Sequence, residues 1–146
     1  MPEPARHPVP IAEGLFRFDT DGPRLVGSRC TACGEVAFPK QTSCPACTAA
    51  AGQDIALATE GTLWTWTVQR FPPPTPPYVA PPGGFKPYGV GYVELADGVR
   101  VEARLTENDP AKLVIGMRMH LVLEVMGADA TGAPLVTFAF APSTPA

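Results

Sequence analysis

Residues 30–34, CTACG, and residues 44–47, CPAC, decide the fold of this chain. Together they give the spacing C-x2-C-x10-C-x2-C, which is a strong metal-site signal. Two residues between the cysteines of each pair let both sulfurs face one ion, and Zn²⁺ takes a tetrahedron of such ligands. The sequence therefore predicts one zinc ion held by Cys30, Cys33, Cys44 and Cys47.

A site with four thiolate ligands has no open position, so we expect the zinc to be structural and not to activate water. A ribbon of about 25 residues cannot bury enough apolar area to fold alone, so metal binding should supply the folding energy. Gly34 suits the tight turn after the first pair. Residues 36–38, VAF, should form the returning strand, which Pro39 ends.

Three other uses of the cysteines stay open. They could form two disulfides, hold a rubredoxin-type iron, or act as a redox dithiol. We favour zinc because one ion explains both pairs at this spacing. The first 14 residues also hold four prolines and no apolar signal core, so we expect no signal peptide and a reducing, cytoplasmic location.

Composition limits the functions open to the chain. Its 146 residues suggest one domain or two small ones. Charged residues make up 17%, against about 25% in an ordinary soluble domain, which suggests a surface that a partner covers. The net charge of −3 lacks the basic excess of a nucleic-acid binder. The sequence contains no run of about 18 apolar residues, so it predicts no membrane-spanning helix.

The second half of the chain alternates as strands do, and the fold class we predict is mostly β. In residues 99–105 the apolar side chains take one face and the charged ones the other. We place Trp64, Trp66 and Val68 on one face of the first strand. The five predicted strands are residues 62–70, 88–95, 99–105, 117–126 and 135–141.

A short turn or single helical turn at residues 107–116, between the third and fourth strands, gives the arrangement of an OB-fold barrel. We divide the chain into an N-terminal tail at 1–22, a zinc ribbon at 23–53 and an OB-fold domain at 54–146.

A proline-rich loop at residues 71–88 separates the first two predicted barrel strands. Proline lacks a backbone donor, so this loop cannot lie inside a sheet. Its aromatic residues are of the kind enriched at interfaces, and the flanking cations could meet a phosphate or carboxylate. Alternatively, the aromatic rings pack back over the barrel mouth. The candidate ligand- or partner-binding residues are Arg70, Phe71, Tyr78, Phe85, Lys86 and Tyr88.

The inventory of catalytic groups is thin. All four cysteines are assigned to the metal, so no thiol remains as a nucleophile. His7 lies in the tail, and His120 alternates with apolar neighbours, which places it on an outer strand face. The motifs of serine hydrolases, phosphate-binding loops and zinc peptidases are missing. We therefore expect no catalytic residue and no catalysis by the chain alone.

The order of these motifs resembles that of a known family. A CxxCG ribbon is followed by Phe-Pro, CPxC and a strand ending in Val-x-Arg, and the proline-rich loop closes in Pro-Tyr. Val-Glu-Leu, Gly-Val and Ile-Gly-Met follow, at residues 93–95, 98–99 and 115–117. Over residues 24 to about 142, the chain resembles small acyl-CoA-associated proteins that join a rubredoxin-like zinc ribbon to an OB-fold. Two features depart from the family: Thr48 stands where glycine is frequent, and residues 1–22 show no clear helix.

The resemblance implies an accessory subunit of a thiolase-like enzyme, either a thiolase or a retro-aldol lyase, that acts on acyl-CoA thioesters. It implies a role in sterol, aromatic or fatty-acid degradation and allows a CoA thioester at the shared interface. The family's zinc ligands map onto the four cysteines. Two rivals remain: a single-stranded nucleic-acid binder that stacks bases on Trp64 and Trp66, and a free-standing acyl-CoA-binding protein.

Overall fold

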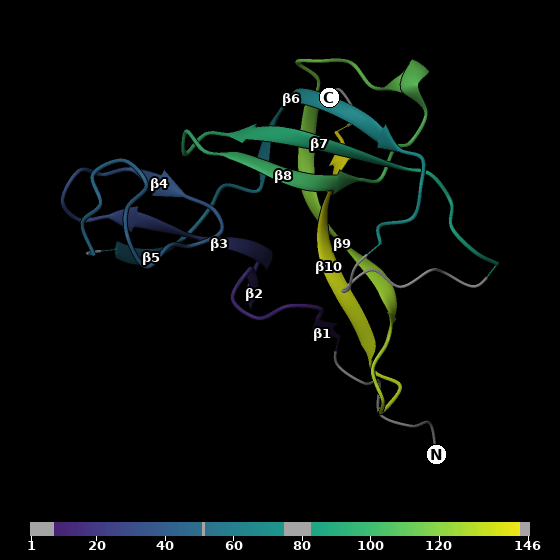
Figure 1. Ribbon diagram of the computed structural model, residues 1–146, viewed down its shortest axis with the longest axis horizontal. Helices are drawn as coiled ribbons and strands as arrows, with labels where there is room; N and C mark the ends of the chain where they lie inside the picture. Colours follow the sequence, from purple (N-terminus) through teal and green to yellow (C-terminus); the bar gives the residue numbers. More distant parts are fainter. Residues whose placement is uncertain (1–7, 51, 75–82, 144–146) are drawn as a thin grey trace.

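The computed structural model describes residues 8–50, 52–74 and 83–143 and divides them into a ribbon and a barrel (Figure 1). The N-terminal strands are β1 (Val9–Pro10), β2 (Phe16–Asp19), β3 (Gly22–Cys30), β4 (Val36–Ala37) and β5 (Gly52–Ala56). The later elements are β6 (Glu60–Gln69), β7 (Tyr88–Leu95), β8 (Arg100–Leu105), the 3-10 turn η1 (Pro110–Lys112), β9 (Arg118–Ala128) and β10 (Pro134–Pro142).

Strands β6 to β10 form a closed five-stranded barrel, as predicted. Strands β6, β7 and β8 pair antiparallel in sequence order, and β8 pairs in parallel with β10. Strand β9 closes the ring because it pairs with β10 along one edge and with β6 at residues 118–120. The 3-10 turn η1 lies between β8 and β9, where the sequence predicts a short turn or a single helical turn. Within the described residues, no helix has the length and apolar character to cross a membrane.

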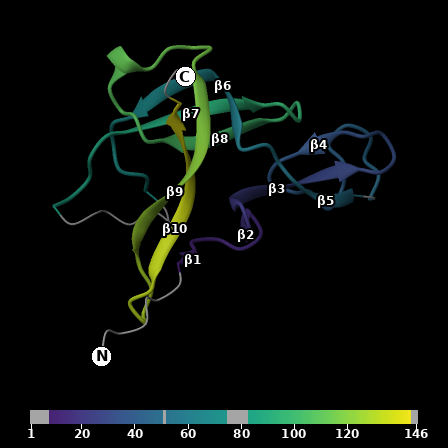
Figure 2. The ribbon, with the colours of Figure 1, turned by 180° about the vertical axis from the view of Figure 1, so that it is seen from behind.

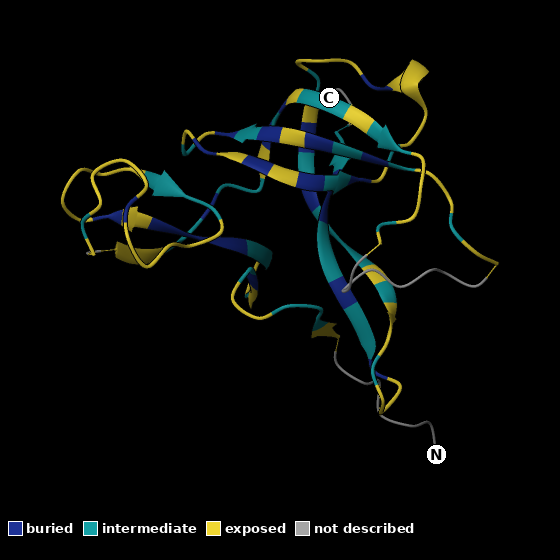
Figure 3. Cartoon of the chain, viewed as in Figure 1, coloured by how far each residue is buried: buried dark blue, intermediate teal, exposed yellow. Residues whose placement is uncertain are grey.

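The barrel core follows from the alternation of apolar side chains. Val99, Val101, Ala103 and Leu105 are buried while Arg100 and Glu102 are exposed, which confirms the predicted faces. Figure 3 shows buried and exposed residues alternating along β7 and β8. The largest side chains that the barrel buries almost completely are Phe140, Leu63, Met119, Val93 and Val101.

The predicted common face of Trp64, Trp66 and Val68 is wrong. Leu63 pairs with Val93 and Thr65 with Tyr92, so one extra residue, Trp64, is inserted in β6 as a bulge. A bulge reverses the alternation, because side chains on a strand change face with every residue. Trp64 is therefore 46% exposed, whereas Trp66 is half-buried against the core.

The ribbon is built around β3, which pairs with three strands. Its first half pairs with β2, and its second half lies between β4 and β5. The part of the predicted tail that is described, residues 8–22, contains β1 and β2. Phe16 in β2 is buried, and β1 joins the barrel sheet by pairing in parallel with residues 135–136.

Ribbon and barrel share one continuous core. Leu25 of β3 and Leu57 of the connector are fully buried in the same cluster as the barrel residues, and the Leu57 amide donates to the Leu25 carbonyl at 2.9 Å. The amide of Ala58 donates to Asp97 Oδ2 at 2.7 Å, which ties the connector to the turn between β7 and β8. Figures 1 and 2 show the ribbon against one end of β7 and β8.

Candidate metal centre and docking surface

The two cysteine pairs sit in turns with the same backbone hydrogen bonds. In the first turn the Gly34 amide donates to the Cys30 carbonyl, and in the second the Thr48 amide donates to the Cys44 carbonyl, each at 2.9 Å. The Cys30 and Cys44 amides likewise each donate to a carbonyl five residues further along the chain. These repeated turns hold the cysteines of each pair on one side of the backbone.

The four sulfur atoms form a compact cage. All lie within 4.8 Å of one another, with Cys30 Sγ 3.6 Å from Cys47 Sγ and Cys33 Sγ 3.5 Å from Cys44 Sγ. A tetrahedron with Zn–S bonds of about 2.3 Å needs sulfur separations close to these values. The donor set therefore fits a structural zinc ion with no position left for water or substrate.

Backbone amides around the cage donate hydrogen bonds to the cysteine sulfurs. The amides of Ala46 and Cys47 donate to Cys44 Sγ at 3.3 and 3.4 Å. In the first turn, a hydrogen bond from the Cys33 backbone is the main cause that lowers the pKa of Cys30 from 9.0 to about 6. Backbone hydrogen bonds from Glu35 and Ala49 also lower the pKa values of Cys33 and Cys47, but hydrogen bonds with the neighbouring sulfurs outweigh them and raise the pKa of Cys33 to about 12 and that of Cys47 above its usual value. Since metals bind the deprotonated sulfur, an ion that enters the cage must release these protons.

The same distances contradict the disulfide alternative. All four cysteines are free, and the two shortest sulfur contacts are far longer than the ~2.05 Å of an S–S bond. One cage that gathers both pairs also leaves no separate dithiol for redox chemistry.

Thr48 occupies a backbone conformation that favours glycine. Its φ is +66°, and the equivalent residue of the first turn, Gly34, has φ +82°. A β-branched residue in this left-handed region is strained. This chain therefore builds the second turn with a threonine at the position that a glycine occupies in the first turn.

The described residues among those predicted to bind a ligand or partner lie around the paired ends of β6 and β7, where Gln69 pairs with Tyr88. Arg70 is exposed and Phe71 is 65% exposed beyond the end of β6. Phe85 contacts Tyr88 with ring centroids 6.1 Å apart, so these two rings pack back toward the barrel, while Lys86 is exposed. Tyr78 lies outside the described residues.

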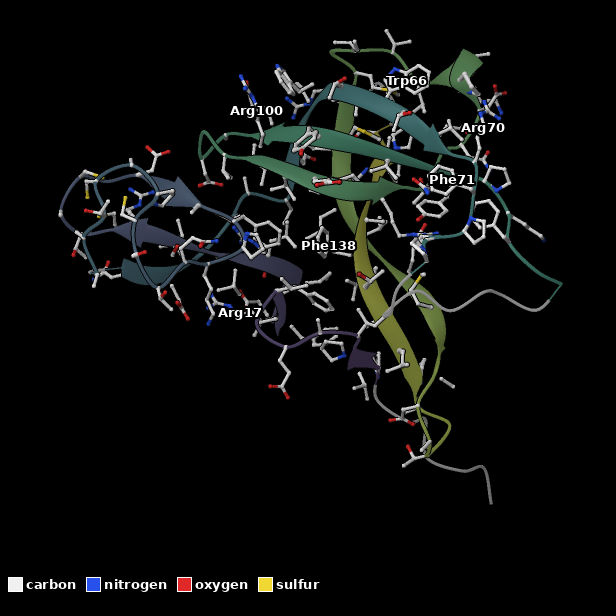
Figure 4. All side chains as sticks on the ribbon, viewed as in Figure 1. Arg17, Trp66, Arg70, Phe71, Arg100 and Phe138 are labelled. Atoms are coloured by element: carbon white, nitrogen blue, oxygen red, sulfur yellow. The ribbon has the colours of Figure 1, made fainter. Side chains whose placement is uncertain are left out.

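On the outer face of β6, β7 and β8, the predicted Tyr88 belongs to a larger set of exposed and half-buried aromatic and arginine side chains that sequence reasoning missed. The Arg100 guanidinium lies over the Trp64 ring at 4.0 Å, and Arg104 lies over Tyr88 at the same distance. Tyr92 meets Trp64 edge-on, with ring centroids 6.1 Å apart. Figure 4 shows Arg100 at the opposite end of these strands from Arg70 and Phe71. The alternating charged residues of 99–105 indicated that the arginines lie on the outer face. The aromatic residues beside them could not be predicted, because these neighbours depend on the register between strands.

The sulfur cage and the closed barrel define a zinc-ribbon protein with an OB-fold. Residues 22–51 match the family domain described as "ChsH2, rubredoxin-like zinc ribbon domain", and residues 54–124 match "ChsH2, C-terminal OB-fold domain". The chain belongs to this ChsH2 family of zinc-ribbon and OB-fold proteins.

Relatives of similar length support this membership. A "DUF35 domain-containing scaffold protein" of Pyrococcus furiosus is 32% identical over 82% of this chain and 83% of its own length. The "Benzoylsuccinyl-CoA thiolase subunit BbsA" of Thauera aromatica is 27% identical over 86% of this chain and 83% of its own. A solved chain of the "Ltp2-ChsH2(DUF35) aldolase" superposes with a TM-score of 0.62 at 30% identity, covering 83% of this chain and 86% of that one.

Proposed function

We propose that this chain is a non-catalytic accessory subunit of a thiolase-like enzyme complex, a thiolase or a retro-aldol lyase, that acts on acyl-CoA thioesters. The observation that carries the proposal is the similarity, along most of both chains, to one protein named a thiolase subunit and to one chain of a solved aldolase. The catalytic cysteine and histidine would then belong to the partner.

The chemistry of the sulfur cage supports a structural role. Four thiolates around one zinc ion leave no ligand position for a thioester carbonyl. Because all four cysteines of the chain are spent there, no thiol remains to take an acyl group. The metal would fix the ribbon so that the chain can stabilise its partner and help shape the entrance for CoA or the acyl group.

The finer part of the proposal concerns the substrate. We infer a place in sterol, aromatic or fatty-acid degradation, in the cytoplasm. The named aromatic acyl-CoA substrate of BbsA supports this class. Growth of a deletion strain on a sterol, an aromatic acid and a fatty acid would separate the three, since only the affected substrate should fail to support growth.

Co-expression tests the main proposal. The chain is produced with a thiolase-like protein from its own genome, here called the neighbour, and with an unrelated thiolase as the control. We expect a stable complex with the neighbour alone, no thioester cleavage by the isolated chain, and a partner that is less active or less soluble without it. Turnover by the isolated chain at the rate of the complex would refute the proposal.

The two rival functions have direct tests. Trp64 and Trp66 do not share a face, which removes the paired stacking platform that the nucleic-acid reading used. A salt-dependent shift of a labelled oligonucleotide at micromolar protein would revive that reading. Calorimetry of the isolated chain with CoA esters tests the free-standing acyl-CoA-binding protein, which should bind without a partner.

A further inference from the structure

A groove of about 830 Å³ runs along the outer face of β7 and β8 where the ribbon meets the barrel. We call it the ribbon–barrel groove and define it by the lining residues Phe38, Tyr88, Tyr92, Arg100, Arg104 and Phe138. Phe38 comes from the ribbon and the other five from the barrel. The groove therefore exists as a single surface only while both parts are folded and joined.

One wall depends on a ring contact between the two parts. Phe38 directly follows β4, which pairs with β3 next to the metal cage. Its ring meets Phe138 of β10 edge-on, with centroids 5.5 Å apart. Figure 4 places Phe138 between the barrel and the ribbon. Because the ribbon needs its ion to hold its shape, we expect this wall to depend on zinc.

The groove floor combines aromatic rings with preoriented cations. Arg100 Nε binds Glu94 at 2.9 Å and Arg104 Nε binds Glu124 at 3.1 Å, while each guanidinium plane lies over an aromatic ring. The carboxylate of Glu102 also lines the groove, where it accepts a hydrogen bond from a groove tyrosine at 3.4 Å. Within the described part of the chain, the hydrogen bonds of both guanidinium groups run through Nε. Their Nη atoms therefore remain for an acceptor from outside, and a carboxylate is the acceptor that fits such a fork.

We propose that the ribbon–barrel groove receives an apolar segment of the thiolase-like subunit that carries a carboxylate. The aromatic rings cover the apolar part, and Arg100 and Arg104 bind the acid. This inference rests on the proposed function, because it takes that subunit as the partner. A protein segment fits better than a small ligand, since the groove is open to solvent and contains exposed Tyr92, whereas small-molecule sites enclose their ligands.

A competition experiment tests the groove against the proline-rich loop. The thiolase-like neighbour carries an affinity tag and is co-expressed with equal amounts of wild-type chain and one variant. Intact mass spectrometry then gives the ratio of the two chains in the purified complex. Tyr92→Ala and Arg100→Gln change the groove floor, and Phe38→Ala changes its ribbon wall. Phe71→Ala is the matched control, because Phe71 is an exposed aromatic residue of the proline-rich loop that does not line the groove.

We expect each groove variant to fall about tenfold below wild type in the complex, and Phe71→Ala to stay within twofold. Zinc content and the thermal midpoint of each free variant show that it is folded. The surface variants Tyr92→Ala and Arg100→Gln decide the matter if Phe38→Ala loosens the ribbon. Groove variants that compete as well as wild type, or a tenfold loss with Phe71→Ala alone, would overturn the inference.

Other occupants of the groove give different results. Binding of a CoA ester to the isolated chain that Tyr92→Ala abolishes would assign the groove to a small ligand. A dimer of the isolated chain that Tyr92→Ala dissociates in sedimentation would assign it to a second copy. If the wild-type chain itself forms no complex with the neighbour, the proposed function fails along with the inference. A complex that tolerates all groove variants rejects the inference alone.

Discussion

The ribbon tip and the barrel of this chain differ in how much apolar surface they bury. Between residues 31 and 50, Cys44 is the one buried residue, and the rest are exposed or half-buried. The barrel buries side chains from all five strands, with Phe140 and Val101 fully inaccessible. Apolar burial is thus the main source of stability in the barrel, while the tip has almost none and depends on four metal–sulfur bonds.

Removing one zinc ligand should give the largest effect and should separate the two regions. Cys44→Ser is expected to abolish zinc binding, because the apparent binding free energy of such sites, about 10–16 kcal/mol, requires the full ligand set. The ribbon tip should then unfold while the barrel sheet persists. Zinc per chain by mass spectrometry, with amide exchange mapped along the sequence, measures both parts.

Ala46→Ser is the matched control, since it adds a hydroxyl to an exposed position in the same turn. It should keep one zinc ion per chain. Full protection of residues 31–50 in metal-free Cys44→Ser would contradict the contrast between the two regions.

Truncating the barrel core is the second largest change. Phe140→Ala should lower the free energy of unfolding by about 3–5 kcal/mol, because it leaves a cavity in a fully buried site. Phe71→Ala, which removes the same atoms from an exposed ring, should change it by less than about 0.5 kcal/mol. Urea denaturation followed by tryptophan fluorescence compares the two variants. Equal losses of unfolding free energy would show that the barrel core is not the main source of stability.

The connection between ribbon and barrel should loosen when Asp97 is replaced. Asp97→Ala removes the carboxylate that accepts from the Ala58 amide, and a hydrogen bond to a charged group contributes about 1.5–3 kcal/mol. We expect faster hydrogen exchange at Ala58 and little change within β8. Asp97→Asn keeps an acceptor oxygen and should retain part of the protection. If the alanine variant exchanges as slowly as wild type, the shared core alone holds the joint.

Sequence reasoning predicted the barrel well because its strands alternate. The range of β7, Tyr88–Leu95, is the one that the alternation gave, and the buried row of β8 is correct to the residue. The four metal ligands could also be predicted, since the spacing of the cysteines is a local property of the sequence. The bulge at Trp64 could not be predicted, because an inserted residue is defined only by its pairing with the partner strand.

Strand β3 and the aromatic and arginine side chains of the groove were not predicted from the sequence, for related reasons. Residues 25–28 of β3 are buried in succession, so no alternation marks them. A Cβ on Gly27 would lie 2.7 Å from the Ala37 carbonyl oxygen, a constraint that only the paired strand reveals. The stacking of Arg100 on Trp64 and of Arg104 on Tyr88 likewise joins residues far apart in sequence through strand register. Proline-rich composition drew attention to the loop instead.

The smallest predicted effect lies within the ribbon and compares its two turns. Thr48→Gly should stabilise the second turn, because a left-handed conformation costs an L-residue about 1–2 kcal/mol and glycine adopts it freely. The larger entropy that glycine loses on folding offsets part of this, which leaves a gain of about 0.5–1 kcal/mol.

Gly34→Ala is the mirror change and should lose a similar amount, since the added Cβ meets no atom within 4 Å and only the backbone conformation resists it. The rate at which a chelator removes zinc should fall in Thr48→Gly and rise in Gly34→Ala, with barrel unfolding unchanged in both. Opposite changes in the two rates would establish that backbone strain at residues 34 and 48 makes the two turns differ in stability, because both turns supply the same cysteine ligands. A faster rate in both would mean that contacts of the Thr48 side chain, and not the conformation of its backbone, hold the second turn.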